Sequence, residues 1–177
     1  MAVLTIPSEQ RQILEPEEIQ AYLRKINIGF EQWQANQPLT AEATAEQVLA
    51  AYEPEIAQLN ARGGYVTADV IDIHADTPNL EVMLAKFNRE HYHNEDEVRF
   101  TIAGRGLFHI NPQTSAVVSV TVEAGDLLVV PKGTWHWFNL CSERRIRAIR
   151  LFQDMSGWLP HYSDSKIEEN FQPLCFA

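Results

Sequence analysis

The rest of the chain is organised around the segment His91-Tyr92-His93-Asn94-Glu95-Asp96-Glu97, which is followed by Gly104. It carries two imidazoles and a carboxylate at the spacing H-x-H-x3-E. On an extended backbone, residues two apart point to the same face, so His91 and His93 can converge on one ion. Glu97 can rejoin them after a tight turn. The stretch therefore predicts three ligands of a metal site within one short β segment.

A second stretch supplies a fourth ligand. Gly125 is followed by Pro131-Lys132-Gly133, and then by His136 and Asn139. The glycines and the proline favour turns that bring the next strand back, and His136 adds an imidazole from a separate strand. The two stretches together resemble the paired motif of the cupin superfamily. This resemblance implies a small antiparallel β-barrel of the jelly-roll type, with a metal between facing strands.

Short β-rich runs dominate the sequence after residue 64. They recur at roughly ten-residue spacing between turn residues, which is typical of an antiparallel sandwich or barrel. The strands are expected at residues 65–73, 80–87, 98–103, 106–110, 116–122, 126–130, 136–140 and 146–152. The chain is therefore expected to be mainly β, with a barrel core over residues 65–153.

The first 64 residues are expected to be mostly helical and to pack on the outside of the barrel. Residues 1–6 favour a short opening strand. Residues 15–29 show apolar side chains at i, i+3, i+4 and i+7, which predicts a helix. Residues 40–62 predict further helix, broken at Pro54.

The whole chain is expected to form one domain. Its 177 residues suit a single core, and no repeat or linker interrupts them. Residues 154–177 lose periodicity and are expected to be a C-terminal extension. Monomer is the expected oligomeric state.

Composition excludes several function classes. The net charge of −10, from 24 acidic and 14 basic residues, argues against a nucleic-acid or anionic-membrane surface. No apolar run approaches the ~20 residues of a membrane span, and no signal peptide is evident, so a cytoplasmic protein is expected. Cys141 and Cys175 lack C-x-x-C spacing, which predicts neither a disulfide framework nor a zinc–thiolate site.

The ligand set indicates a class of metals without selecting one. Three neutral imidazoles and one carboxylate, with no thiolate, suit Fe(II), Ni(II), Mn(II), Co(II) or Zn(II). The remaining histidines, His74, His109 and His161, are expected to be structural.

The residues around the ligands resemble the acireductone dioxygenase family over nearly the whole chain. The resemblance rests on residues 29–33, 97–100, 104–108, 131–138, 148–152 and 157–158. It implies an enzyme of methionine salvage that cleaves acireductone (1,2-dihydroxy-3-keto-5-methylthiopentene) with O2, using one Fe(II) or Ni(II) per chain. The implied products are 4-methylthio-2-oxobutanoate and formate with Fe(II), or 3-methylthiopropanoate, formate and CO with Ni(II). One departure is Asn139, where the family usually has Asp.

The resemblance also implies roles for individual residues. The metal ligands would be His91, His93, Glu97 and His136. The catalytic residues would be Arg99, Asp96 and Arg150, and the pocket walls would be Phe100, Phe138 and Trp158.

Alternatives stay open for the residues outside the ligand set. Arg99 lies two residues past Glu97, on the same strand face, where its guanidinium can stabilise an enediolate. A salt-bridged strand arginine is the alternative for Arg150, and a solvated turn acid is the alternative for Asp96. The three aromatics can equally be core residues.

Two other functions fit the same motif. Another cupin oxygenase or isomerase would share the four ligands but not Arg99, the aromatic block 135–138 or the N-terminal helices. A non-enzymatic, metal-binding cupin sensor would be expected to show degraded ligands or an added DNA-binding segment. The sequence shows intact ligands and no basic helix-turn-helix.

Overall fold

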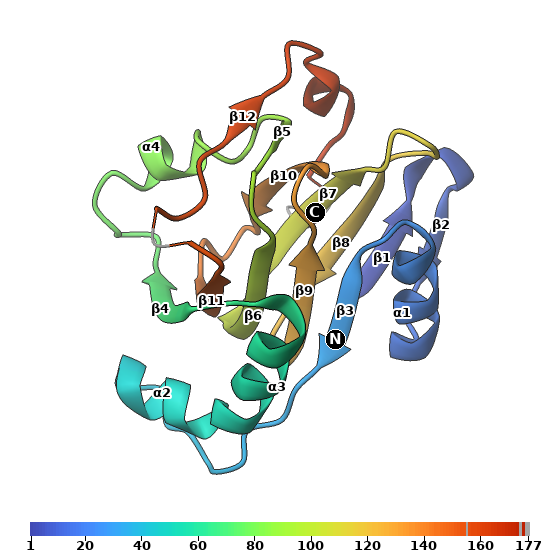
Figure 1. Ribbon diagram of the computed structural model, residues 1–177. Coiled ribbons are helices and arrows are strands. Elements are labelled where there is room, and N and C mark those ends of the chain that lie inside the picture. The colour runs from blue at the N-terminus through green and yellow to red at the C-terminus, as the bar shows by residue number, and fades with distance from the viewer. Residues whose placement is uncertain (155, 174, 176–177) are drawn as a thin grey trace.

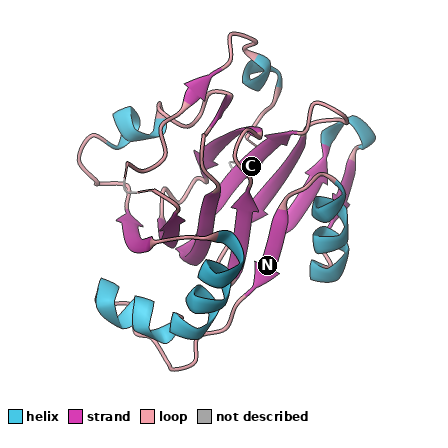
Figure 2. Ribbon diagram, viewed as in Figure 1, coloured by secondary structure: helices cyan, strands magenta, loops and turns pink. Residues whose placement is uncertain are grey.

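Two antiparallel β-sheets face each other and form most of the molecule (Figures 1 and 2). A computed structural model describes residues 1–154, 156–173 and 175. One sheet has the strand order β12-β5-β10-β7-β8-β1-β2, and the other has the order β3-β9-β6-β11-β4. The strands are β1 (Val3–Ile6), β2 (Arg11–Ile13), β3 (Gly29–Gln32), β4 (Thr67–Ile73), β5 (His91–Tyr92), β6 (Glu97–Gly104), β7 (Gly106–Asn111), β8 (Val118–Val122), β9 (Asp126–Val130), β10 (Trp135–Leu140), β11 (Ile146–Phe152) and β12 (His161–Tyr162).

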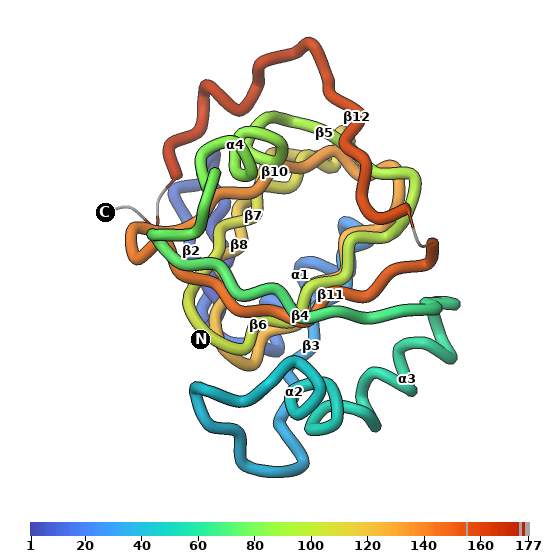
Figure 3. The backbone as a smooth tube through the Cα atoms, turned by 90° about the vertical axis from the view of Figure 1, so that its left-hand side faces the viewer, coloured from blue at the N-terminus to red at the C-terminus, as the bar shows by residue number. Residues whose placement is uncertain are grey.

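The chain encircles a common interior when it is viewed along the sheets (Figure 3). Side chains alternate along each strand, so one face of each sheet points inward. Apolar inward-facing residues, such as Leu4, Phe108, Val120 and Ile146, pack together and fill much of this interior. The arrangement confirms the expected mainly β, cupin-type jelly roll.

The outer face of the five-stranded sheet is covered by two helices, α2 (Ala45–Ala51) and α3 (Glu53–Gly63). Val48 and Leu59 from these helices pack with Val98, Phe100 and Ile149 from the sheet. Thr44 caps α2 through a capping box with Gln47, which satisfies free backbone N–H groups at the helix start. These two helices therefore pack on the outer face of the five-stranded sheet.

The N-terminal segment supplies more strands than the single opening strand expected in a mostly helical region. The predicted opening strand is β1, and the predicted helix is α1 (Pro16–Lys25). The strands β2 and β3 were not predicted; β2 pairs with β1, and β3 pairs with β9. Their hydrogen bonds come from distant partners, so the local sequence carries little signal for them.

The prediction of a strand at residues 80–87 is wrong. Leu80–Leu84 forms the short helix α4, which Asn79 precedes in a left-handed conformation. Leu80 is buried while Val82 is exposed, and Leu84 and Phe87 pack against the core. This spacing of apolar contacts follows a helical repeat rather than the two-residue repeat of a strand.

The C-terminal segment runs back along the seven-stranded sheet. Its strand β12 pairs with β5, with Tyr162 opposite His91. A disulfide joins Cys141 to Cys175, which the number and spacing of the cysteines do not predict. Among the described residues, no helix is both long and apolar enough to span a membrane.

Candidate metal centre

Four buried side chains from both sheets meet at one end of the interior. His91 lies on β5, His93 follows it, and His136 lies opposite His91 on β10. Glu97 is the first residue of β6, in the other sheet. The ligand atoms of these four residues all lie within 4.8 Å of one another. The structure thus brings together the four residues that the sequence predicts as ligands.

The spacing of the donor atoms suits a metal ion. The Nε2 atoms of His93 and His136 each lie 3.1 Å from Oε2 of Glu97. Ligands at right angles on an ion with bonds of about 2.1 Å are about 3 Å apart. The Nε2 atom of His91 is buried and has no hydrogen-bond partner among the described residues. A divalent metal would satisfy this nitrogen, so the residues present fit the ion.

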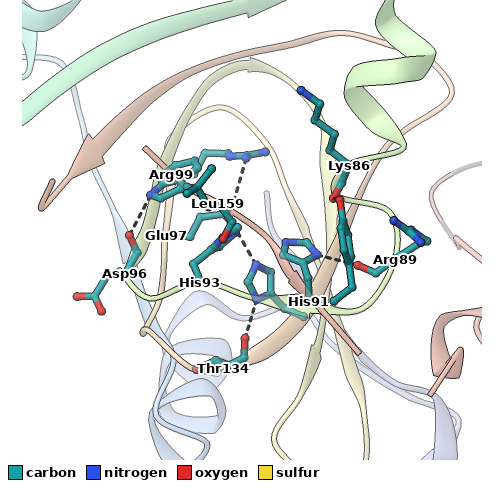
Figure 4. Close-up of polar contacts among 12 residues, drawn as sticks. Lys86, Arg89, His91, His93, Asp96, Glu97, Arg99, Thr134 and Leu159 are labelled. Atoms are coloured by element: carbon teal, nitrogen blue, oxygen red, sulfur yellow. Dashed lines mark hydrogen bonds and ion pairs between the residues drawn. The ribbon is translucent and has the colours of Figure 1, made fainter. Parts of the chain in front are cut away.

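Backbone carbonyls orient all three imidazoles (Figure 4). The Nδ1–H of His91 donates to Arg89 O at 2.7 Å, and that of His136 donates to Thr134 O at 2.8 Å. The Nδ1–H of His93 donates to Leu159 O at 2.9 Å. A carbonyl accepts only from a protonated nitrogen, so the Nε2 lone pairs are left for a metal.

Electrostatics keep His91 and Glu97 in metal-binding forms. Burial, followed by the proximity of His136, lowers the pKa of His91 to about 3. Burial alone would raise the pKa of Glu97, but Arg99 and the neighbouring imidazoles hold it well below its usual range. Burial opposes protonation of His93, but the hydrogen bond to Glu97 raises the pKa of this residue, so a metal would have to displace the Nε2 proton of His93 to bind it. A neutral His91 and an ionised Glu97 are the forms that bind metals.

Arg99 lies beside the ligands, as its position two residues after Glu97 predicts. Its Nη2 donates to Oε1 of Glu97 at 2.9 Å, and its side chain is 7% exposed. The guanidinium carbon lies 4.3 Å from the ring centroid of Phe138. The Nε atom is buried without a hydrogen-bond partner in the described part of the chain. This donor is available to a ligand beside the metal.

One cavity lies next to Arg99, and a second cavity shares two lining residues with it. One, of about 220 Å³, is lined mainly by apolar side chains, including Ile71, Leu84 and Phe138. The other, of about 340 Å³, is lined in part by Trp158. Arg150 and Phe87 line both cavities, so the predicted site residues Phe138, Trp158 and Arg150 line two neighbouring cavities.

Phe100 is not part of this site, and its prediction as a pocket wall is wrong. Its ring packs on Trp33 and Tyr52, at centroid distances of 5.0 and 4.6 Å. These contacts lie on the outer face of the sheet, because Phe100 follows Arg99 directly and neighbours on a strand point to opposite faces. For the same reason, Asn139 lies on the face of β10 opposite that of Phe138.

The carboxylate of Asp96 is turned away from the imidazoles (Figure 4). It accepts hydrogen bonds from the hydroxyl of Tyr65 at 3.0 Å and from the backbone N–H of Lys132 at 2.9 Å. The backbone carbonyl of Asp96 accepts from Nε1 of Trp158 at 3.1 Å. Asp96 thus links three loops, one of which carries Trp158, and this geometry argues against the solvated-turn alternative.

Sequence reasoning missed three contributors. Phe87 was assigned to a strand that does not exist, and Asp69 binds Arg150 from a neighbouring strand. Leu159 acts through its carbonyl, which no residue type signals. One sequence signal could have identified Asp69. It lies in a predicted strand, and if that strand pairs with the strand of Arg150, Asp69 can point to the same face as Arg150.

The other histidines lie outside the ligand cluster. His74 and His161 are exposed, and His109 is buried with its ring stacked on Trp137. None of the three joins the four-residue cluster in the described part of the chain.

Comparisons with known proteins agree on one family. Residues 6–160 match the model of the ARD/ARD′ family. Acireductone dioxygenases from Picosynechococcus sp. and Stutzerimonas stutzeri are each 41% identical to this chain, over 98% of its length and 99% of theirs. A solved acireductone dioxygenase from Bacillus anthracis, with a cadmium ion in its active centre, superposes with a TM-score of 0.84. The two sequences are 35% identical, and the match covers 92% of this chain and 98% of the Bacillus anthracis chain. This chain belongs to the ARD/ARD′ family.

Proposed function

We propose that this chain is a metal-dependent dioxygenase of methionine salvage that cleaves acireductone with O2. The observation that carries the proposal is the buried His91/His93/Glu97/His136 cluster, with Arg99 beside it, in a chain that matches acireductone dioxygenases over nearly its full length. The proposed products are 4-methylthio-2-oxobutanoate and formate with Fe(II). With Ni(II) they are 3-methylthiopropanoate, formate and CO.

The four clustered residues would hold one Fe(II) or Ni(II) per chain. Bound there, a divalent metal supplies Lewis-acid stabilisation of the deprotonated enediol. The Nδ1–carbonyl hydrogen bonds would keep each imidazole in the required tautomer and orientation.

Arg99 would bind the enediolate by donating from its free Nε–H to a substrate oxygen. The guanidinium is buried and fixed by Glu97 and Phe138, so little reorganisation accompanies binding. Arg150 would supply a second positive charge. The negative charges of Glu97 and Asp69 offset the positive charges of the two arginines. A bound divalent metal would therefore leave a local charge of about +2, which suits a dianionic substrate.

The aromatic and aliphatic walls would hold the methylthioalkyl tail and exclude water. Phe138 and Leu84 line the apolar cavity beside Arg99, and Trp158 lines the adjoining one. Apolar walls with a few directed polar groups are typical of small-molecule sites. Asp96 would act by positioning the Trp158 loop through its backbone carbonyl.

We also propose that residues 1–177 form one domain, because β1–β3 share sheets with strands from the rest of the chain.

The test is turnover with defined metals. Protein reconstituted with Fe(II) or with Ni(II) is mixed anaerobically with acireductone, O2 is added, and products are identified for each form. We expect O2-dependent loss of the enediolate absorbance, abolished in His93→Ala and retained in the control His74→Ala. Absence of O2-dependent loss in both reconstituted wild-type forms would refute the proposal and favour a different cupin function.

A further inference from the structure

Three charged side chains form a row across the inner face of the five-stranded sheet. Arg99 on β6 lies opposite Arg150 on β11, and Arg150 lies opposite Asp69 on β4. Directly opposed residues of antiparallel strands point to the same face. The row therefore extends from the metal ligands to the edge of the sheet.

Asp69 holds Arg150 with two parallel hydrogen bonds. The Nε of Arg150 donates to Oδ1 at 2.9 Å, and its Nη2 donates to Oδ2 at 2.6 Å. This bidentate contact fixes the plane of the guanidinium. It leaves Nη1 with no hydrogen bond to the described residues, as a donor available to a ligand.

The position of Arg150 makes its orientation matter. It lines both the cavity beside Arg99 and the larger neighbouring cavity, whereas Asp69 lines only the larger one. The guanidinium carbon of Arg150 also lies 5.5 Å from the ring centroid of Trp158. Arg150 therefore stands where the two cavities meet, and Asp69 holds it from the outer side.

Repulsion from Arg99 would displace Arg150 if Asp69 were absent. The two arginines carry like charges on adjacent strands, and the side chain of Arg150 is 28% exposed, so it has room to swing toward solvent. Arg99 cannot move in the same way, because it is buried against Glu97. The Asp69 carboxylate offsets the repulsion and retains Arg150 in the row.

We propose that Asp69 is a positioning residue, which holds the Arg150 guanidinium with Nη1 directed at the substrate. This role rests on the proposed function, since it assigns the substrate contact to Arg150. Asp69 has a side chain that is 46% exposed, and ion pairs this exposed contribute little to folding. Its contribution is therefore expected in turnover rather than in stability.

The test combines kinetics with a direct view of Arg150. Asp69→Ala, Arg150→Ala and the double variant are compared with wild type, all loaded with the same metal. Glu143→Ala is the matched control, because Glu143 also pairs with an arginine but lies in an exposed pair with Arg105. We expect Asp69→Ala to lower kcat about tenfold or more, with a smaller change in KM and an unchanged Tm.

Non-additivity is the decisive kinetic result. If Asp69 acts through Arg150, the double variant has the kcat/KM of Arg150→Ala alone. Asp69→Asn keeps one acceptor oxygen and is expected to retain an intermediate kcat. Losses that multiply in the double variant, or a wild-type kcat in Asp69→Ala, would overturn the proposal.

Arginine Nε–H signals in ¹H–¹⁵N spectra separate this proposal from the proposed function. The Arg150 signal is assigned by its loss in Arg150→Ala, and it should broaden or exchange faster in Asp69→Ala but not in Glu143→Ala. An unchanged Arg150 signal in Asp69→Ala would overturn the positioning role. If wild type fails to consume acireductone, the proposed function falls, while this spectrum still decides whether Asp69 orients Arg150.

Discussion

Replacing His109 with Phe should make the protein less sensitive to acid. His109 is 1% exposed, and its ring stacks on Trp137 at a centroid distance of 4.7 Å. Its Nδ1 has no hydrogen-bond partner among the described residues. Burial lowers the pKa of His109 from 6.5 to about 4. Phe keeps an aromatic ring on Trp137 and removes the titrating group.

The size of the effect follows from the two pKa values. As the pH falls below 6.5, the unfolded chain binds a proton at residue 109, whereas the folded chain does not until about pH 4. The stability that depends on neutral His109 is thus present above pH 6.5 and is lost as the pH falls to 4. Linkage gives a loss of about 2 kcal/mol between pH 7 and pH 5, and roughly 3 kcal/mol by pH 4.

Urea unfolding followed by circular dichroism measures this difference. Wild type and His109→Phe are compared without metal at pH 8, 7 and 5, so that the metal ligands titrate equally in both. We expect the free energy of unfolding of wild type to fall about 2 kcal/mol more than that of the variant between pH 7 and pH 5. Between pH 8 and pH 7, the free energies of unfolding of wild type and variant should change by the same amount. Parallel behaviour down to pH 5 would refute the assignment of a neutral, buried imidazole.

Three further results are expected. His93→Ala should lose bound metal as well as turnover, measured by elemental analysis after gel filtration; a variant with full metal content would contradict the ligand assignment. Arg99→Met should keep its metal while kcat falls about 10²- to 10³-fold, as for removal of a donor that stabilises developing charge, and a near-normal kcat would remove Arg99 from catalysis. Reducing the Cys141–Cys175 disulfide, which spans 34 residues, should lower the free energy of unfolding by about 2–4 kcal/mol. The Cys141→Ser variant should show no such response to reductant, and an equal response there would disprove the bridge.

The metal site was predictable because its ligands follow local rules. His91 and His93 share a face at a spacing of two, and His136 lies in a second motif of recognisable spacing. The same alternation of side chains places Arg99 on the face of Glu97 and Phe100 on the opposite face, away from the pocket. Phe100 was wrongly predicted as a pocket wall because its aromatic type was given more weight than its position on the strand. Asp69 required knowledge of which strand pairs with β11, which the local sequence does not contain.

The errors in the fold have a common cause. Residues 80–87 form a short apolar run, for which helix and strand patterns are hard to tell apart. The strands β2 and β3 are short and are stabilised by partners far along the chain. The Cys141–Cys175 bridge depends on the path of the C-terminal segment across the sheet. In each case, tertiary contacts decide a structure that local preference leaves open.

The use of backbone carbonyls to orient the imidazoles has a consequence for tolerance to mutation. Arg89, Thr134 and Leu159 each contribute an acceptor that every amino acid possesses. Substitution of their side chains cannot delete these hydrogen bonds; only a change in the path of the chain can. These three hydrogen bonds therefore place no demand on residue type, and substitutions that leave the path of the chain unchanged should keep the same histidine tautomers.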